Sequence, residues 1–144
     1  MIVTNFETYS SAYLNKAYKD EEYMIKHMEI ADDQKSFEAI IDIKNHNVDT
    51  TGKFHLSVTM ASIIVQQLGV IYAFASENEA KDREIYYLKE SWRYKRQVAN
   101  PSDILFRFRD IKPRRSKIGV SFECSVDISD GAFAGQCKIL KPIA

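Results

Sequence analysis

The chain has 144 residues, a length at which one domain buries most of its apolar surface, so a single core without disulfide or metal staples is expected. Lysine plus arginine number 20, and aspartate plus glutamate also number 20. This neutral balance provides no global field that would draw the protein toward nucleic acid or an anionic membrane, so any anionic partner must be met by a local patch.

The N-terminal segment, residues 1–20, is predicted to be a short helical extension. Aromatic side chains recur at Phe6, Tyr9, Tyr13 and Tyr18, a spacing that suits an amphipathic helix on the surface of the fold. The segment lacks both a basic start and an uninterrupted apolar stretch, so we expect no secretory signal and a cytoplasmic protein.

Two segments of alternating polarity then predict an antiparallel hairpin. Its strands are expected over residues 22–30 and 36–44, and in the second of these Phe37, Ala39, Ile41 and Ile43 share one face. A polar turn over residues 31–35 joins the strands, and a polar loop over residues 45–53 leads to the next element.

An uncharged segment from Val58 to Ala75 predicts a helix at the centre of the fold. Ser57 or Thr59 is expected to cap its N-terminus, and the helix is expected to end at about Ser76. Its 18 residues are the lower limit for a membrane span, but polar residues interrupt it and strand-like segments follow, so we expect no membrane span. Because apolar residues cover nearly every face of the helix, a curved sheet must enclose it.

Four further strands are predicted over residues 85–96, 104–111, 117–128 and 132–140. In the third strand, apolar side chains from Ile118 to Ile128 occupy one face at every second position. Pro101 and Pro113 are expected in the connections between strands. The order of elements predicts an α+β fold in which one antiparallel sheet wraps around one long central helix.

The turn Ser129-Asp130-Gly131 is predicted to join the last two strands and to place Cys124 opposite Cys137. Both cysteines are expected to remain reduced thiols. They form no C-x-x-C motif and no His/Cys cluster, so we expect no metal site and no cofactor.

The loop Thr51-Gly52-Lys53-Phe54-His55, followed by a helix that contains Gln66-Gln67-Leu68, resembles the hotdog superfamily. In that superfamily a loop rich in Gly, His and Phe leads into the N-terminus of the central helix. The chain is most similar to FcoT-like fatty-acyl-CoA thioesterases, over roughly Tyr23 to Pro142. The resemblance implies a single hotdog-like domain over residues 1–144, a homodimer or higher homo-oligomer, an acyl-CoA or acyl carrier protein thioester as partner, and a role in fatty acid metabolism.

The sequence departs from related dehydratases at two places. In those enzymes a catalytic histidine comes just after the loop glycine and the helix carries an acidic partner. Here Lys53 follows Gly52, His55 lies two places further on, and the segment from Ser57 to Ser76 contains no aspartate or glutamate. Dehydration is therefore the less favoured chemistry.

Thioester cleavage needs a donor to the carbonyl oxygen and a group that activates or orients water. First-turn N–H groups of the central helix, near Val58 to Met60, can supply the donor. His55 is the first candidate for the base, because an imidazole beside a helix N-terminus tends to be neutral, and Asp49 is the candidate carboxylate. Structural roles compete with both assignments: a loop histidine bonded to a backbone carbonyl and an aspartate that stabilises a turn.

Gln66 is the third catalytic candidate. An unpaired amide inside an apolar helix costs about 1–3 kcal/mol, so Gln66 or Gln67 must have a partner. Gln66 shares a face with Ser62 and Thr59, which favours contact with an acyl group or its water; a bond to a strand carbonyl or across a dimer interface is equally supported. The residues predicted to bind substrate near this face are Asn47, Val58, Thr59 and Ser62.

Positive charge gathers on the late strands, and Arg107 and Arg109 are the residues predicted to hold the phosphates of coenzyme A or the acidic surface of a carrier protein. Nucleic-acid binding is a rival explanation, which the neutral overall charge disfavours, so no nucleic-acid partner is expected. A solvated strand face also explains such alternation.

The sequence thus predicts an acyl thioester hydrolase acting on acyl-CoA or acyl carrier protein substrates. Two alternatives stay open: a non-catalytic acyl-binding hotdog module, which the missing helix carboxylate favours, and an acyl dehydratase-like enzyme of lipid or polyketide metabolism.

Overall fold

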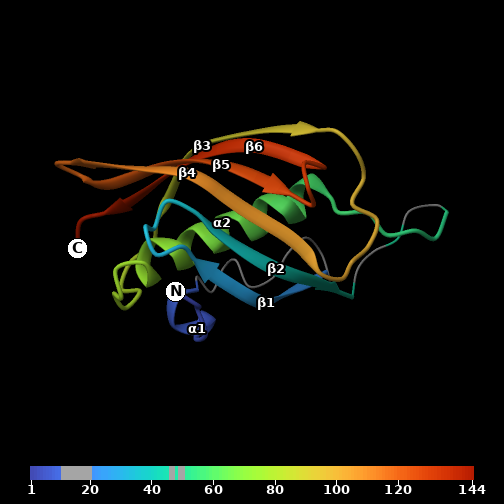
Figure 1. The fold of residues 1–144 in the computed structure, drawn as a ribbon, viewed down its shortest axis with the longest axis horizontal. Helices are drawn as coiled ribbons and strands as arrows, with labels where there is room; N and C mark the ends of the chain where they lie inside the picture. Colours follow the sequence, from blue (N-terminus) through green and yellow to red (C-terminus); the bar gives the residue numbers. More distant parts are fainter. Residues whose placement is uncertain (11–20, 46–47, 49–50) are drawn as a thin grey trace.

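The computed structural model describes residues 1–10, 21–45, 48 and 51–144. Its elements are α1 (Phe6–Tyr9), β1 (Glu22–Ile30), β2 (Phe37–Lys44), α2 (Val58–Ala75), β3 (Tyr86–Tyr94), β4 (Ile104–Ser116), β5 (Gly119–Ile128) and β6 (Phe133–Pro142). The strands form one antiparallel sheet in the order β1-β2-β4-β5-β6-β3. The sheet curves around α2, which lies along its inner face (Figure 1), so the predicted α+β architecture is confirmed.

Burial of α2 holds this arrangement together. Ile64, Val65, Leu68 and Ile71 are fully buried, and the apolar inner faces of the strands pack against them. By length and composition α2 could cross a membrane, but 72% of it is buried inside the fold. The helix is therefore a core helix, as expected for a segment that is apolar on nearly every face.

Both ends of α2 are capped by hydrogen bonds. The Ser57 side chain accepts a hydrogen bond from the Met60 amide at 3.1 Å, which confirms Ser57 as the N-cap. At the other end, amides of the following turn donate to the carbonyls of Tyr72, Phe74 and Ala75. The carbonyl of Ala73 accepts instead from the buried ammonium group of Lys141 on β6, at 2.9 Å.

Strand β4 is longer than predicted. It continues to Ser116, and Pro113 lies within it opposite Phe122, so the predicted end at residue 111 and the placement of Pro113 in a connection are wrong. The amide of Ile111 points toward the turn that precedes β2, where it donates to the carbonyl of Lys35. Two residues further on, the nitrogen of Pro113 faces the same way, beyond the last residue with which β2 pairs, so its missing N–H removes no ladder bond.

The last hairpin and the N-terminal helix follow the prediction where the structure describes them. Cys124 and Cys137 are direct partners on β5 and β6, as predicted, and are free thiols with their sulfur atoms 3.0 Å apart. Gly131 in the preceding turn has a φ of 85°, which a residue without a Cβ adopts readily. The N-terminal helix is confirmed only over Phe6–Tyr9, because residues 11–20 lie outside the described part of the chain.

Candidate functional site

The central helix is open on one face, and only near its N-terminal half. Val58 and Thr59 are exposed there, while Ser62, Ile63 and Gln66 are half-buried. Positions 59, 62 and 66 follow the spacing that places side chains on one side of a helix. Strand β3, at the end of the sheet order, borders this face, so a ligand could reach the polar side chains between helix and strand.

A carboxylate from β3 joins these side chains. The Ser62 hydroxyl donates to one oxygen of Glu90 at 2.9 Å, and the indole N–H of Trp92 donates to the other oxygen at 2.7 Å. The side-chain amide of Gln66 donates to the Ser62 oxygen at 3.3 Å. We call Ser62, Gln66, Glu90 and Trp92 the Glu90 cluster. Each carboxylate oxygen already has one donor, which fixes the plane of the group and leaves further lone pairs for a water or substrate proton.

A β-bulge at Leu88 points Glu90 toward the helix. On β3, Tyr87 pairs with Ile139 of β6, yet Lys89 pairs with its immediate neighbour Lys138, so Leu88 has no partner of its own. The extra residue shifts the alternation by one. As a result Tyr87 and Glu90 both face α2, although strict period-two alternation would put them on opposite sides of the strand.

Tyr87 sets the close distance between β3 and the helix. Its hydroxyl donates to the carbonyl of Val65 at 2.7 Å. A Cβ at Gly69 would lie 2.2 Å from that hydroxyl oxygen, so only glycine leaves room for it. This packing holds β3 near enough for Glu90 to reach Ser62.

The N-terminus of α2 supplies donors one turn away from Ser62. Ser57 satisfies the amide of Met60, which leaves the amides of Val58 and Thr59 as the first-turn donors. His55 is exposed and precedes this cap by two residues, and the loop is anchored by a bond from the Leu56 amide to the carbonyl of Val98 at 2.9 Å. Partial positive charge at this end favours a substrate oxygen that becomes negative during the reaction.

The structure brings together some of the residues predicted for the site. Ser62 and Gln66 belong to the Glu90 cluster, while His55, Val58 and Thr59 lie around the helix N-terminus that precedes it. Asn47 and Asp49 lie outside the described residues. The sequence does not single out Glu90, because its position on β3 gives no sign that it faces the helix.

Arg107 and Arg109 are not part of this arrangement. They alternate on β4 with Phe106 and Phe108, which are buried against the core, so the two arginines lie on the outer face of the sheet. The sheet therefore separates them from the Glu90 cluster.

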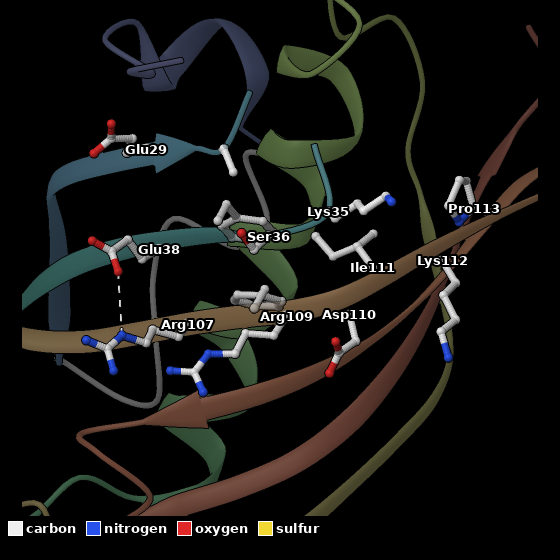
Figure 2. A pocket seen from close by; sticks show the side chains of 13 residues that line it. Glu29, Lys35, Ser36, Glu38, Arg107, Arg109, Asp110, Ile111, Lys112 and Pro113 are labelled. Atoms are coloured by element: carbon white, nitrogen blue, oxygen red, sulfur yellow. Dashed lines mark ion pairs between the residues drawn. The ribbon is translucent and has the colours of Figure 1, made fainter. Parts of the chain in front are cut away.

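On that outer face the arginines line an open groove of about 1020 Å³ between β2 and β4 (Figure 2). Arg107 forms ion pairs with Glu38 and Asp130, each at 3.5 Å. Arg109, Asp110 and Lys112 follow it along the strand. Positive and negative groups are mixed here, so the groove is polar without being strongly cationic. Within the described residues, no three His, Cys, Asp or Glu side chains gather in a way that could hold a metal ion.

Neither models of protein families nor curated proteins show a match to the chain. Solved structures do match along most of its length. A dehydratase heterocomplex, ApeI:P, from Xenorhabdus doucetiae is 14% identical with a TM-score of 0.60, covering 96% of this chain and 91% of that one. A thioesterase superfamily protein from Shewanella loihica PV-4 is 14% identical with a TM-score of 0.58, covering 95% and 98%. The chain has the hotdog fold.

A third hotdog structure is a hypothetical thioesterase protein with coenzyme A from Streptococcus pneumoniae TIGR4. It is 8% identical to this chain with a TM-score of 0.53, and the match covers 83% of this chain and 84% of that one. At these identities the similarity establishes the shared fold and not a shared chemistry.

Proposed function

We propose that this hotdog protein is an acyl thioester hydrolase acting on acyl-CoA or acyl carrier protein substrates. The observation that carries the proposal is the Glu90 cluster, a carboxylate held by two donors on the one open face of the central helix. Solved hotdog structures named as thioesterases, one of them with coenzyme A, support the same reaction class. An FcoT-like role in fatty acid metabolism is part of the proposal.

In the proposed reaction, the thioester carbonyl oxygen binds at the amides of Val58 and Thr59. A water between substrate and Glu90 gives a proton to the carboxylate as its oxygen attacks the carbonyl carbon. The carbon–sulfur bond then breaks, and the proton passes to the leaving thiolate. Ser62 and Trp92 keep the carboxylate in one orientation, and Gln66 contacts the acyl group or its water.

The other predicted residues have separate roles in this proposal. His55 and Asp49 are candidate water-orienting groups, and Asn47 is a candidate contact to the substrate. Arg107 and Arg109 would bind phosphates of a carrier that extends over the outer face of the sheet. Replacement of either arginine by Gln should then raise KM and leave kcat unchanged, whereas loss of His55 should lower kcat.

We propose that the protein works as a homodimer or higher homo-oligomer that pairs through β3. This strand ends the sheet order, and on it Tyr86, Leu88 and Tyr94 are about half exposed. An edge strand with exposed apolar side chains is a template for pairing with another chain. Sedimentation equilibrium should give twice the chain mass of 16.6 kDa, and a 16.6 kDa species alone would contradict the pairing. We also place the protein in the cytoplasm, in agreement with the two unbonded thiols.

Release of free thiol from acyl-CoA substrates of graded chain length tests the reaction. Glu90→Gln keeps the shape of the cluster but removes the base, and we expect kcat to fall about 100-fold to 10,000-fold. Glu123→Gln, at an exposed position on β5 that pairs with Lys138, is the matched control and should leave kcat unchanged. No hydrolysis by folded, dimeric protein, together with a retained lipid in its mass spectrum, would replace the proposal with the non-catalytic acyl-binding module.

An acyl dehydratase-like reaction is the second candidate. It is supported by the match to the dehydratase heterocomplex, and by Glu90, which provides the carboxylate that the helix lacks. The two reactions are separated by incubating the protein with a 2-enoyl-CoA. Loss of the conjugated enoyl absorbance without thiol release indicates hydration, and thiol release indicates hydrolysis.

A further inference from the structure

The tip of the β4–β5 hairpin is strongly basic. It projects beyond the rest of the sheet at one end of the molecule, where the two orange strands meet in Figure 1. Residues 112–118 carry four positive charges, on Lys112, Arg114, Arg115 and Lys117, and no negative charge. All four side chains are exposed, and within the described chain none of them forms an ion pair. In a chain whose overall charge is zero, this is a local field of one sign.

Two exposed aliphatic side chains lie at the same tip. Ile118 is 61% exposed and Ile143 is 65% exposed. The Ile143 amide donates to the Ile118 carbonyl at 3.0 Å, one position beyond the pair formed by Gly119 and Pro142, so the two isoleucines lie opposite each other. Side chains directly opposite in an antiparallel pair share a face. The tip therefore presents one small apolar surface contributed by two separate segments.

The alternation of the hairpin places cations on both sides of this apolar surface. Arg115 pairs with Val120 and Arg114 pairs with Ser121, so consecutive arginines face opposite sides of the hairpin. Val120 and Arg115 line a cavity on the helix side together with Phe122, which identifies the face to which Arg115 belongs. The acidic side chains near the tip lie toward its base. Glu123, which lies opposite Lys112, forms an ion pair with Lys138, and Asp33 and Glu77 line the cavity that Arg115 also lines.

We propose that this hairpin tip docks the protein onto an anionic lipid membrane surface. A projecting tip fits a broad flat surface better than it fits a groove. Exposed aliphatic side chains ringed by lysine and arginine match the two layers of such a surface, because the cations meet the lipid phosphates while the isoleucines enter the boundary with the acyl chains. Docking is peripheral, since α2, the one long apolar helix among the described residues, is buried in the core.

Vesicle cosedimentation tests the proposal without reference to enzymatic activity. The intact protein is mixed at low salt with vesicles of phosphatidylcholine alone, or of equal parts phosphatidylcholine and phosphatidylglycerol. We expect binding to the anionic vesicles and little to the neutral ones, with affinity that falls as salt is added. Equal binding to both vesicle types, or to neither, would overturn the proposal.

Matched variants then test the location. The combination Arg114→Gln, Arg115→Gln and Lys117→Gln should lower the partition coefficient on the order of 100-fold, at roughly fivefold per cation. The control combination Lys44→Gln, Arg93→Gln and Lys95→Gln removes the same charge from exposed positions away from the tip and should change it less than about threefold. Equal losses from the two combinations would refute the assignment to the tip.

The isoleucines and rival partners complete the test. Ile118→Ser with Ile143→Ser should weaken vesicle binding at high salt, where the electrostatic contribution is screened, while the protein keeps its unfolding midpoint. If the tip variants instead weaken turnover or binding of an acyl carrier protein while vesicles never bind, the partner is an acidic protein and the membrane proposal fails. Tight salt-sensitive binding to RNA without vesicle binding would overturn it as well.

Discussion

Lys141 connects the C-terminal end of α2 to strand β6, and its replacement should destabilise the fold. Its side chain is 3% exposed, and its ammonium group lies 2.9 Å from the Ala73 carbonyl, 3.0 Å from Glu77 and 2.8 Å from Glu79. It also lies 4.8 Å from the ring centre of Phe74. The variant that isolates the charge is Lys141→Met, because methionine keeps an unbranched apolar side chain against that ring.

Three contacts of Lys141 contribute to the free energy of unfolding. The Ala73 carbonyl would lose its donor and stay buried at a helix end, which costs about 1–3 kcal/mol. Glu77 and Glu79 are 35% and 41% exposed, so solvent screens their pairs with Lys141, and together these contribute about 1 kcal/mol at most. The cation–π contact with Phe74 adds about 0.5–1 kcal/mol. The free energy of unfolding should therefore fall by about 2–4 kcal/mol.

Urea denaturation followed by circular dichroism measures this change, with an unchanged m-value expected if only the native state is affected. Lys138→Met on the same strand is the control. Lys138 is about one-third exposed and pairs with Glu123 at 3.6 Å, so its loss should cost less than about 1 kcal/mol. A Lys141→Met variant whose stability lies within about 0.5 kcal/mol of the wild type would refute the reasoning.

The remaining predictions concern pH, packing and thiol chemistry. The hydrogen bond from Lys141 holds the pKa of Glu79 below its ordinary value, so this contribution to stability is present above about pH 4.5 and is lost as the pH falls through the lowered pKa; acid titration of Lys141→Met should show a smaller loss. Gly69→Ala should lower the free energy of unfolding by about 1–3 kcal/mol, because the new Cβ clashes with the Tyr87 hydroxyl. The same substitution should lower it less in a Tyr87→Phe background, which a double-mutant cycle measures. The hydrogen bond between the Cys137 and Cys124 thiols, together with burial, raises the pKa of Cys137. Iodoacetamide at pH 8 should therefore label Cys137 slowly in the native protein and rapidly in urea, and equal rates would contradict this.

The order of elements could be predicted because each has a strong period. The alternation on β5 from Phe122 to Ile128 and the uncharged run of α2 leave few other arrangements, and both are confirmed with ends that differ by one or two residues. Residues of one helix that share a face could also be predicted. Ser62 and Gln66 were placed on one helix face by spacing alone, and the hydrogen bond between them confirms this.

Features that depend on contacts between distant segments could not be predicted. Lys141 is recognised as a buried cation only once the fold brings Glu77 and Glu79 to it across more than 60 positions of the chain. Glu90 cannot be singled out for a related reason, because a bulge has no sequence signature that distinguishes it from a continuous strand. Pro113 was assigned to a connection since the edge on which its nitrogen lies cannot be known before the strand order is known.

The bulge at Leu88 makes the chemistry of this protein depend on the pairing register of one strand. A register in which Leu88 paired with Lys138 would restore strict alternation, turn Glu90 and Trp92 toward solvent on the outer face, and bring Lys89 under the helix instead. Deletion of Leu88 itself would leave Glu90 facing the helix, because Tyr87 and Lys89 would keep their partners Ile139 and Lys138. Homologous hotdog chains compared position by position across this strand, without a gap, would place unlike side chains opposite one another at the point where function is decided.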